Sequence, residues 1–313
     1  MSARYAFIDA EKADLETKIT TGAVEAVEVP SIAMMCSWLK VSRSGFYEWR
    51  DREVSARDAR REVVAAHVQA AFDAGRGTYG ARRVHAILTR CDDPAVASAS
   101  LKLVRSIMRE LRLFACQPRA FRTTTVNDGG GAGIQDHLQR DFTAEAPGAK
   151  LVGDITYIRT WEGWVYLATV IDCHTRTVLG WSMATHMRAD LICDALTMAA
   201  ARIDLSAGAV FHSDRGSQYT SSDFRKHLKK LNVTASMGRT GVCWDNALAE
   251  SFFGALKNEL VHRRVFTTRR KARTAIAEYI EVFYNRIRIH STLGYRTPHE
   301  ILAEYQQNIA LAA

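Results

Sequence analysis

Apolar residues recur at helical spacing through the first third of the chain, in short amphipathic stretches separated by turn residues. Residues 31–50, SIAMMCSWLKVSRSGFYEWR, predict a helix, a tight turn at Val41 and Ser42, and a second short helix. This length and turn are typical of a helix-turn-helix, and equally of an ordinary helical hairpin. Further helices are expected at about 56–74 and 98–112.

The period of the pattern changes in the second half of the chain. LVGDITYIRT alternates, and WVYLATVID and TVLGWSM are apolar, β-rich runs, which together predict a three-stranded antiparallel meander. A helix at about 189–203, a strand at AVFHSD, a helix at SSDFRKHLKKL and a strand at VTASM follow. We therefore expect an α/β fold: a ribonuclease H-like mixed sheet with helices on both faces, preceded by an all-α domain of helix-turn-helix type.

A glycine-rich stretch separates the two patterns. In NDGGGAG, residues 127–133, three consecutive glycines cannot support a helix or strand without a large entropic cost. The predicted organisation is a helical DNA-binding region at 1–126, a glycine-rich linker at 127–135, a ribonuclease H-like core at 136–268 and a C-terminal helical extension at 269–313.

Composition narrows the class of protein. A formal net charge of +8 over 313 residues favours a polyanionic partner such as nucleic acid, although a merely basic soluble protein has the same balance. The six cysteines form no C-x-x-C pair, so neither a zinc knuckle nor a disulfide framework is indicated. The first twenty residues lack the apolar core of a signal peptide. We expect a cytoplasmic, nucleoid-associated protein.

Three acidic residues lie in separate, strongly patterned stretches. Asp154 falls in the first predicted strand of the core, Asp214 just beyond the fourth, and Glu250 in a following helix. Three converging carboxylates repel one another, and a bound divalent cation usually offsets this repulsion. Oxygen ligands select magnesium or manganese, and two such ions suit in-line phosphoryl displacement. Taken singly, each of these acids is more often a turn, cap or solvated residue.

The sequences around these acids resemble the second-reading-frame transposases of the IS-three group of insertion sequences. GDITYI is similar to the family's first-aspartate strand, HSDRGSQYTS to its second-aspartate motif, and SMGRTGVCWDNALAESFFGALKNEL to its glutamate motif. YNRIRIHSTLGYRTPHE resembles the C-terminal signature, and VSRSGFYEWR and YGARRVHAILTR extend the likeness over about residues 31–304. Between the second aspartate and the glutamate lie positions 215–249, the 35-residue separation for which the family is named.

The resemblance implies a retroviral-integrase-type catalytic core. Such a core is a DDE-type polynucleotidyl transferase that binds double-stranded DNA, both the element's terminal inverted repeats and the target. It catalyses metal-dependent strand cleavage and strand transfer. The resemblance also implies that Asp154, Asp214 and Glu250 are the catalytic, metal-binding triad, with two Mg²⁺ or Mn²⁺ ions in each active site.

Further polar residues of the motifs suit contacts to phosphates or bases. The candidates are Arg215, Gln218, Asn246, Lys257, Arg82 and Arg83. Their structural alternatives are that Asn246 caps the glutamate helix, that Gln218 satisfies a loop backbone, and that the arginines are solvated. Gly254 shares a polar helix face with Glu250 and Lys257, which suggests the close approach of DNA or of a neighbouring backbone.

The chain departs from the family pattern in two respects. Leu151 and Val152 replace a tryptophan often found before the first aspartate. Members of the family usually act as a frameshift fusion with an upstream product that carries a helix-turn-helix and leucine zipper, and this chain has no sustained leucine heptads. Synapsis of two element ends implies at least a homodimer.

Two other functions compete with transposition. One is a catalytically silent, transposase-derived DNA-binding repressor, against which the intact acidic motifs argue. The other is a ribonuclease H-like nuclease for RNA–DNA hybrids, against which the basic helical N-terminal region argues.

Overall fold

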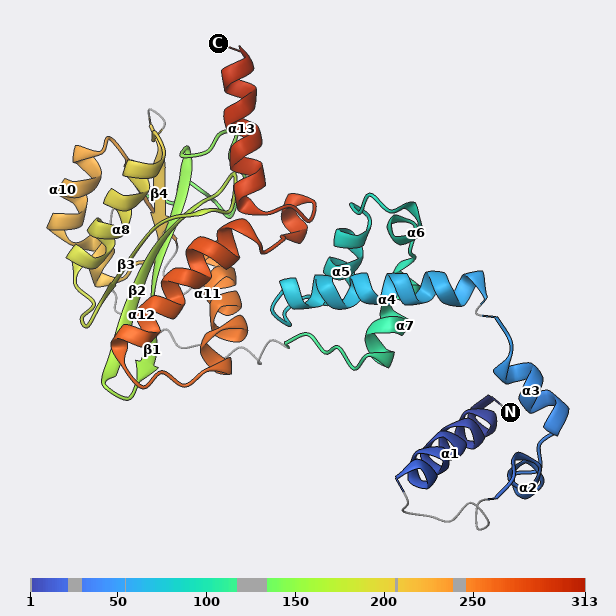
Figure 1. Ribbon diagram of the computed structural model, residues 1–313. Coiled ribbons are helices and arrows are strands. Elements are labelled where there is room, and N and C mark those ends of the chain that lie inside the picture. Colours follow the sequence, from blue (N-terminus) through green and yellow to red (C-terminus); the bar gives the residue numbers. More distant parts are fainter. Residues whose placement is uncertain are drawn as a thin grey trace. The chain divides into compact units, whose positions relative to one another are not determined.

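The computed structural model describes residues 2–21, 30–53, 55–116, 134–205, 208–238 and 246–312 (Figure 1). Its contacts divide the chain into two compact units, residues 1–63 and 64–313. Residues 127–133 of the predicted linker lie outside the described residues, so the proposed domain boundaries stay a prediction. Within the described ranges, none of the helices has the length and apolar character needed to cross a membrane.

The first unit is helical, as predicted. Its helices are α1 (Ser2–Thr20), α2 (Ile32–Trp38), α3 (Arg43–Arg50) and the first part of α4 (Ala56–Ala74). The predicted turn is present because the Ser42 side chain accepts a hydrogen bond from the Gly45 backbone N–H and so begins α3. Phe46 of α3 packs with Tyr5 and Ile8 of α1 in a small core. The sequence had not indicated α1.

The second unit begins with the rest of α4 and a group of short helices. These are α5 (Ala81–Leu88), α6 (Pro94–Ala97) and α7 (Leu101–Glu110). Side-chain caps set two of the starts: Asp93 accepts the Ala95 N–H, and Ser100 accepts the Leu103 N–H. The helices predicted at 56–74 and 98–112 are confirmed.

A five-stranded mixed sheet forms the centre of the second unit. Its strands are β1 (Lys150–Thr160), β2 (Gly163–Asp172), β3 (Val178–Ala184), β4 (Val210–Ser213) and β5 (Thr234–Met237). The spatial order is β3-β2-β1-β4-β5. The first three strands are antiparallel, whereas β4 pairs parallel to β1, and β5 parallel to β4. This is the predicted ribonuclease H-like order.

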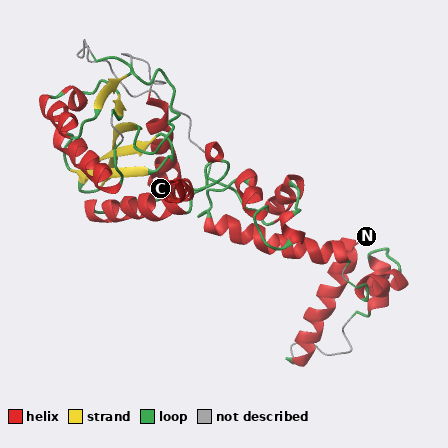
Figure 2. Cartoon of the chain, turned by 90° about the horizontal axis from the view of Figure 1, so that it is seen from above, coloured by secondary structure: helices red, strands yellow, loops and turns green. Residues whose placement is uncertain are grey.

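Helices cover both faces of the sheet, which confirms the predicted layers (Figure 2). They are α8 (Ala189–Arg202), α9 (Ser217–Thr220), α10 (Ser222–Lys230), α11 (Ala247–Glu259) and α12 (Arg269–Glu278). A further helix, α13 (Pro298–Ala312), follows them along the chain. Leu151 and Val170 pack toward α8 and α10, including Phe224. Val152 and Val165 point the other way, as alternation along a strand requires, and pack with α11 and α12.

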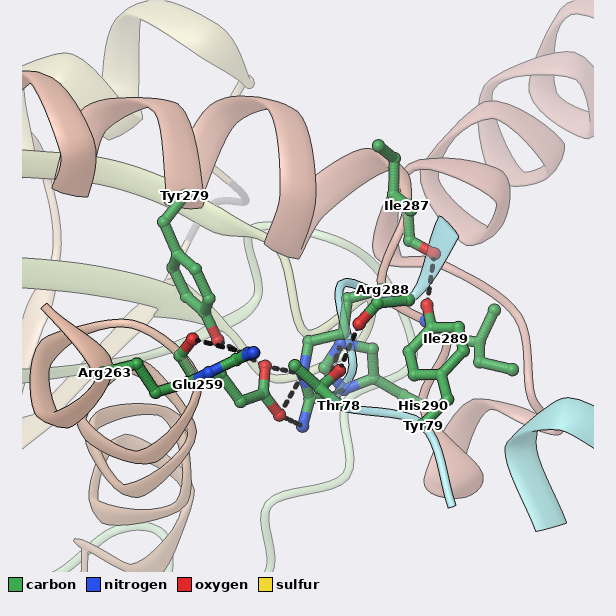
Figure 3. Close-up of polar contacts among 10 residues, drawn as sticks. Thr78, Tyr79, Glu259, Arg263, Tyr279, Ile287, Arg288, Ile289 and His290 are labelled. Carbon is green, nitrogen blue, oxygen red and sulfur yellow. Dashed lines mark hydrogen bonds and ion pairs between the residues drawn. The ribbon is translucent and has the colours of Figure 1, made fainter. Parts of the chain in front are cut away.

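A polar cluster fastens the end of α11 to the segment before α5 (Figure 3). We call Tyr79, Glu259, Tyr279 and Arg288 the anchor cluster. The Arg288 guanidinium donates to both Glu259 carboxylate oxygens, with Nη2 2.7 Å from Oε1, and Tyr279 donates to the same carboxylate at 2.8 Å. The Tyr79 hydroxyl donates to the Ile287 carbonyl oxygen at 2.9 Å. That hydroxyl also accepts the Ile289 backbone N–H, and the two Tyr79 bonds join parts of the chain about 200 residues apart.

Candidate active site

The parallel pairing of β1 with β4 brings two of the predicted catalytic residues to the same level of the sheet. The last paired residues are Val152 and His212. Asp154 and Asp214 each follow two positions later, so both lie just beyond the end of the shared ladder. Side chains two residues apart share a face of a strand, and this register therefore places the two carboxylates near each other.

The electrostatics of the two aspartates agree with that placement. The pKa of Asp154 is raised to about 8, first by burial, then by the negative charge of Asp214 and less by that of Glu250. The backbone N–H of Ile155, 2.7 Å from the Asp154 carboxylate, and the charge of Lys257 act in the opposite direction. Burial also raises the pKa of Asp214. The Asp214 carboxylate accepts a hydrogen bond from the Gly216 N–H at 3.0 Å, which acts in the opposite direction.

Glu250 lies in the first turn of α11, where the helix dipole favours a carboxylate. Burial alone raises its pKa, so its interaction with the aspartates is the weaker one. Residues 239–245, which lead into α11, lie outside the described residues. In the ranges that the structure describes, no three His, Cys, Asp or Glu side chains form a group able to hold a metal ion. The geometry thus pairs the two aspartates and leaves Glu250 beside them.

Three buried oxygen atoms next to the aspartates lack a hydrogen-bond partner among the described residues: Thr169 Oγ1, Tyr219 Oη and Asn246 Oδ1. Thr169 lies opposite Asp154 in the β1–β2 register. The aspartate charges raise the pKa of Tyr219 further above the level that burial sets. Asn246 donates to the Gly153 carbonyl oxygen at 3.2 Å. Buried oxygens without partners beside two carboxylates fit a hydrated divalent cation.

Two of the predicted DNA-contacting residues are engaged with loop backbone. The Arg215 Nε donates to the Gly238 carbonyl oxygen at 2.8 Å. The Gln218 amide donates to the Met187 carbonyl oxygen at 3.1 Å, as its structural alternative anticipated. Asn246 occupies the position before α11 without a side-chain capping bond. These contacts hold the loops around the aspartates in place.

The polar face of α11 is open at its centre. A Cβ added at Gly254 would meet no described atom within 4 Å, so no neighbouring backbone accounts for this glycine. Lys257 is partly exposed on the same helix, and its ammonium lies 5.9 Å from the centroid of the Tyr157 ring. Close packing against the described part of the chain is therefore not the reason for a small residue beside Glu250 and Lys257.

The adjacent arginines of α5 have different environments. Arg82 is exposed, whereas Arg83 is half-buried with its guanidinium 5.7 Å from the centroid of the Tyr79 ring. Burial and the charge of Arg288 lower the pKa of Arg83. Arg82 thus meets solvent, while Arg83 adjoins the anchor cluster.

Comparison with known proteins agrees with this architecture. Integrase core domain models match residues 144–243 and 231–298, and an HTH-like domain model matches residues 58–121. Transposase InsF for insertion sequence IS3A from Escherichia coli strain K12 is 41% identical over 272 residues, 86% of this chain and 93% of that protein. The chain belongs to the IS3 family of insertion-sequence transposases.

Transposase InsF for insertion sequence IS3fB from the same strain is 40% identical to this IS3-family transposase over 282 residues, 90% of this chain and 96% of that protein. A solved structure of the HTLV-2 integrase catalytic core domain in complex with magnesium aligns at 17% identity with a TM-score of 0.41, over 50% of this chain and 98% of that one. The HTH-like match covers α4 to α7 and begins after the helix pair at residues 31–50.

Sequence reasoning missed Thr169 and Tyr219. Thr169 lies in the apolar run WVYLATVID and Tyr219 inside a motif already assigned to Asp214, so neither had a separate signal. Only the strand register and the burial of their hydroxyls place them beside the acids.

Proposed function

We propose that this IS3-family transposase cleaves a DNA strand at the end of its element and joins the freed 3′-hydroxyl to another phosphodiester. The observation that carries the proposal is the pairing of Asp154 and Asp214 at the end of the β1–β4 ladder, where the charge of Asp214 helps to raise the pKa of Asp154. Two such carboxylates repel each other when both are ionised, and they suit a bound cation.

Asp154, Asp214 and Glu250 would hold the divalent cations, with Mg²⁺ or Mn²⁺ the ions that an all-oxygen donor set prefers. When bound, these ions supply Lewis-acid stabilisation of the reacting phosphate and lower the pKa of a water molecule. The partnerless oxygens of Thr169 and Tyr219 have room to accept or donate hydrogen bonds within the hydrated site.

The reaction needs two displacements at phosphorus. In the first, water attacks the phosphodiester at the element's end, the P–O3′ bond breaks, and the 3′-hydroxyl leaves with a proton. In the second, that hydroxyl attacks a target phosphodiester and displaces another 3′-oxygen. A positive group near the reacting phosphate favours both steps, and Lys257, whose charge already acts on Asp154, is placed for that role.

Binding of the duplex is proposed for the basic residues and for the helical region matched by the HTH-like domain. Arg82 is the exposed member of its motif, and Arg215, Gln218 and Asn246 shape the loops at the carboxylates. At least two copies of the chain act in synapsis, and a frameshift fusion with an upstream product would add further end recognition.

The test is cleavage and joining of a labelled duplex that carries the element's end, with Mg²⁺ or Mn²⁺, by the parent and by Glu250→Gln, Asp154→Asn and Asp214→Asn. We expect the variants to lose joining by at least a thousandfold while end binding stays within about threefold. Joining retained by all three variants would refute the assignment. End binding without cleavage by the parent, alone and as the fusion, would favour the repressor.

A further inference from the structure

The β1–β2 hairpin exposes three large aromatic side chains at its outer end. Tyr157 is 51% exposed, Trp161 76% and Trp164 42%. Single exposed apolar residues are common on protein surfaces, but a group of large rings on one short hairpin marks a binding surface.

The register places part of this group on one face of the sheet. Tyr157 and Arg159 are two residues apart on β1, and Trp164 lies directly opposite Arg159. The Tyr157 and Trp164 rings meet edge to face, with centroids 5.0 Å apart and planes at 86°. This geometry fixes both rings and leaves much of their surface in solvent.

Positive charge flanks the rings. The Lys257 ammonium lies 5.9 Å from the Tyr157 centroid, within the range of a cation–π contact, and Arg159 is exposed beside it. The acid of the hairpin turn, Glu162, accepts the Arg269 backbone N–H at 2.8 Å. We call the five residues Tyr157, Arg159, Trp161, Trp164 and Lys257 the hairpin platform.

The hairpin platform adjoins the catalytic carboxylates along two elements. Tyr157 follows Asp154 by three residues of β1, a rise of about 10 Å, and its side chain leaves the opposite face of the strand. Lys257 follows Glu250 by two turns of α11, also about 10 Å. Lys257 links the two ends of this span, because it lies on the helix of Glu250 and its ammonium approaches the Tyr157 ring. The described pairing of β1 with β4 ends at Val152, so a strand held at the carboxylates can pass this edge of β1 and reach the platform.

We infer that the hairpin platform binds unpaired nucleobases of the DNA strand next to the cleavage point. Exposed aromatic faces stack on bases of any sequence, and neighbouring cations hold the phosphates, which is the chemistry of single-strand binding. Bases in a duplex are stacked on one another and offer no free face. The flanking charges disfavour a second copy of this basic chain as the occupant. The inference rests on the proposed function and extends it, because it states that the DNA near the carboxylates is unpaired.

The test measures equilibrium binding of a short oligothymidine and of a duplex of unrelated sequence to the full chain in EDTA, where no cleavage occurs. The variants are Trp161→Ala, Trp164→Ala and Trp164→Phe, with Ile309→Ala as the control for loss of an exposed apolar side chain on α13. We expect each alanine variant of the hairpin to lose about tenfold in oligothymidine affinity, with duplex affinity changed less than twofold. Trp164→Phe keeps a ring and retains most of the affinity, and Ile309→Ala behaves as the parent.

Three results would overturn the inference. One is that both alanine variants of the hairpin bind oligothymidine with the affinity of the parent while melting at the same temperature as the parent. Another is an equal loss for duplex and single strand. The third is a difference in oligomeric state between the parent and the alanine variants, measured by sedimentation without DNA. The hairpin would then be an interface between protein chains. Because binding is read without metal, failure of the platform is distinguishable from failure of the catalytic assignment, which Glu250→Gln tests separately.

Discussion

Asp172 and Asp154 lie on neighbouring strands of one sheet, and replacing each by asparagine should change stability in opposite directions at high pH. Asp172 is fully buried, and its carboxylate accepts hydrogen bonds from the Gly148 N–H at 2.8 Å and from the Thr175 N–H and hydroxyl at 2.7 Å. Asp154 has one such bond, from the next residue, and faces the charge of Asp214. Burial raises the pKa of both carboxylates, but three hydrogen bonds stabilise the ionised Asp172 and only one stabilises the ionised Asp154.

Replacing Asp154 by asparagine should therefore stabilise the metal-free protein at high pH. Its folded pKa of about 8 lies above the ordinary value of 3.8, so the folded state binds the proton more tightly than the unfolded chain does. The stabilising contribution of this group is complete below pH 3.8 and is lost as the pH rises through 8. From pH 5 to 8 the limit is about 4 kcal/mol, and partial solvent access reduces it to about 2 kcal/mol. Asparagine cannot ionise and escapes this loss.

The assay is thermal unfolding in EDTA at pH 5 and pH 8. We expect the melting temperature of Asp154→Asn, relative to the parent, to rise by about 4–8 °C between the two pH values. Mg²⁺ should raise the melting temperature of the parent more than that of the variant, because it binds the folded site. The matched control, Asp172→Asn, should melt below the parent at both pH values, because asparagine keeps one acceptor oxygen and turns an NH2 group toward donors that the other carboxylate oxygen accepted. An Asp154→Asn variant that melts at or below the parent at pH 8 would refute the reasoning.

The remaining predictions compare neighbouring or chemically matched residues. Glu259→Gln leaves the buried Arg288 guanidinium without its charge partner and should cost about 3–5 kcal/mol, read as a lower melting temperature. Glu278→Gln, in a half-exposed ion pair, should cost less than about 1 kcal/mol, and equal losses would contradict the role of burial. Arg82→Ala should weaken duplex binding and reduce the salt dependence of that binding, with an unchanged melting temperature. Arg83→Ala should instead lower the melting temperature, because its guanidinium packs against Tyr79. The opposite order would reverse the roles of the two arginines.

Local rules were enough to predict most of the fold. Strand alternation and apolar runs located the five strands. In the structure, side-chain caps set the starts of the helices that follow, with Ser221 at α10 and Thr297 at α13. The helix α1 was missed because it buries few residues, among them Tyr5 and Ile8, and its charged and apolar positions form no regular stripe. Its helical state depends on packing against α2 and α3, which no local pattern records.

The sequence predicted the acidic residues of the site through the order of the strands and the glutamate motif, and it did not predict the other side chains around them. Neighbouring strands place Asp154 and Asp214 together, and the motif supplies Glu250. The orientation of a buried hydroxyl is a matter of three-dimensional packing, so Tyr219 looked like an ordinary core residue. The same holds for Arg83, which no property of the sequence distinguishes from its neighbour, and whose burial follows from contacts with a segment about 200 residues away.

One helix carries much of what the proposed chemistry requires. Glu250 lies in the first turn of α11, Lys257 near the middle of its second half, and Glu259 at its last residue. A rigid helix transmits the position of one end to the other, so the bonds from Arg288 and Tyr279 to Glu259 also fix where Glu250 lies. The C-terminal signature that contains Arg288 therefore acts at a distance from the carboxylates. Loss of that ion pair should lower strand joining below what the loss of stability explains, because the helix would no longer hold Glu250 beside the two aspartates.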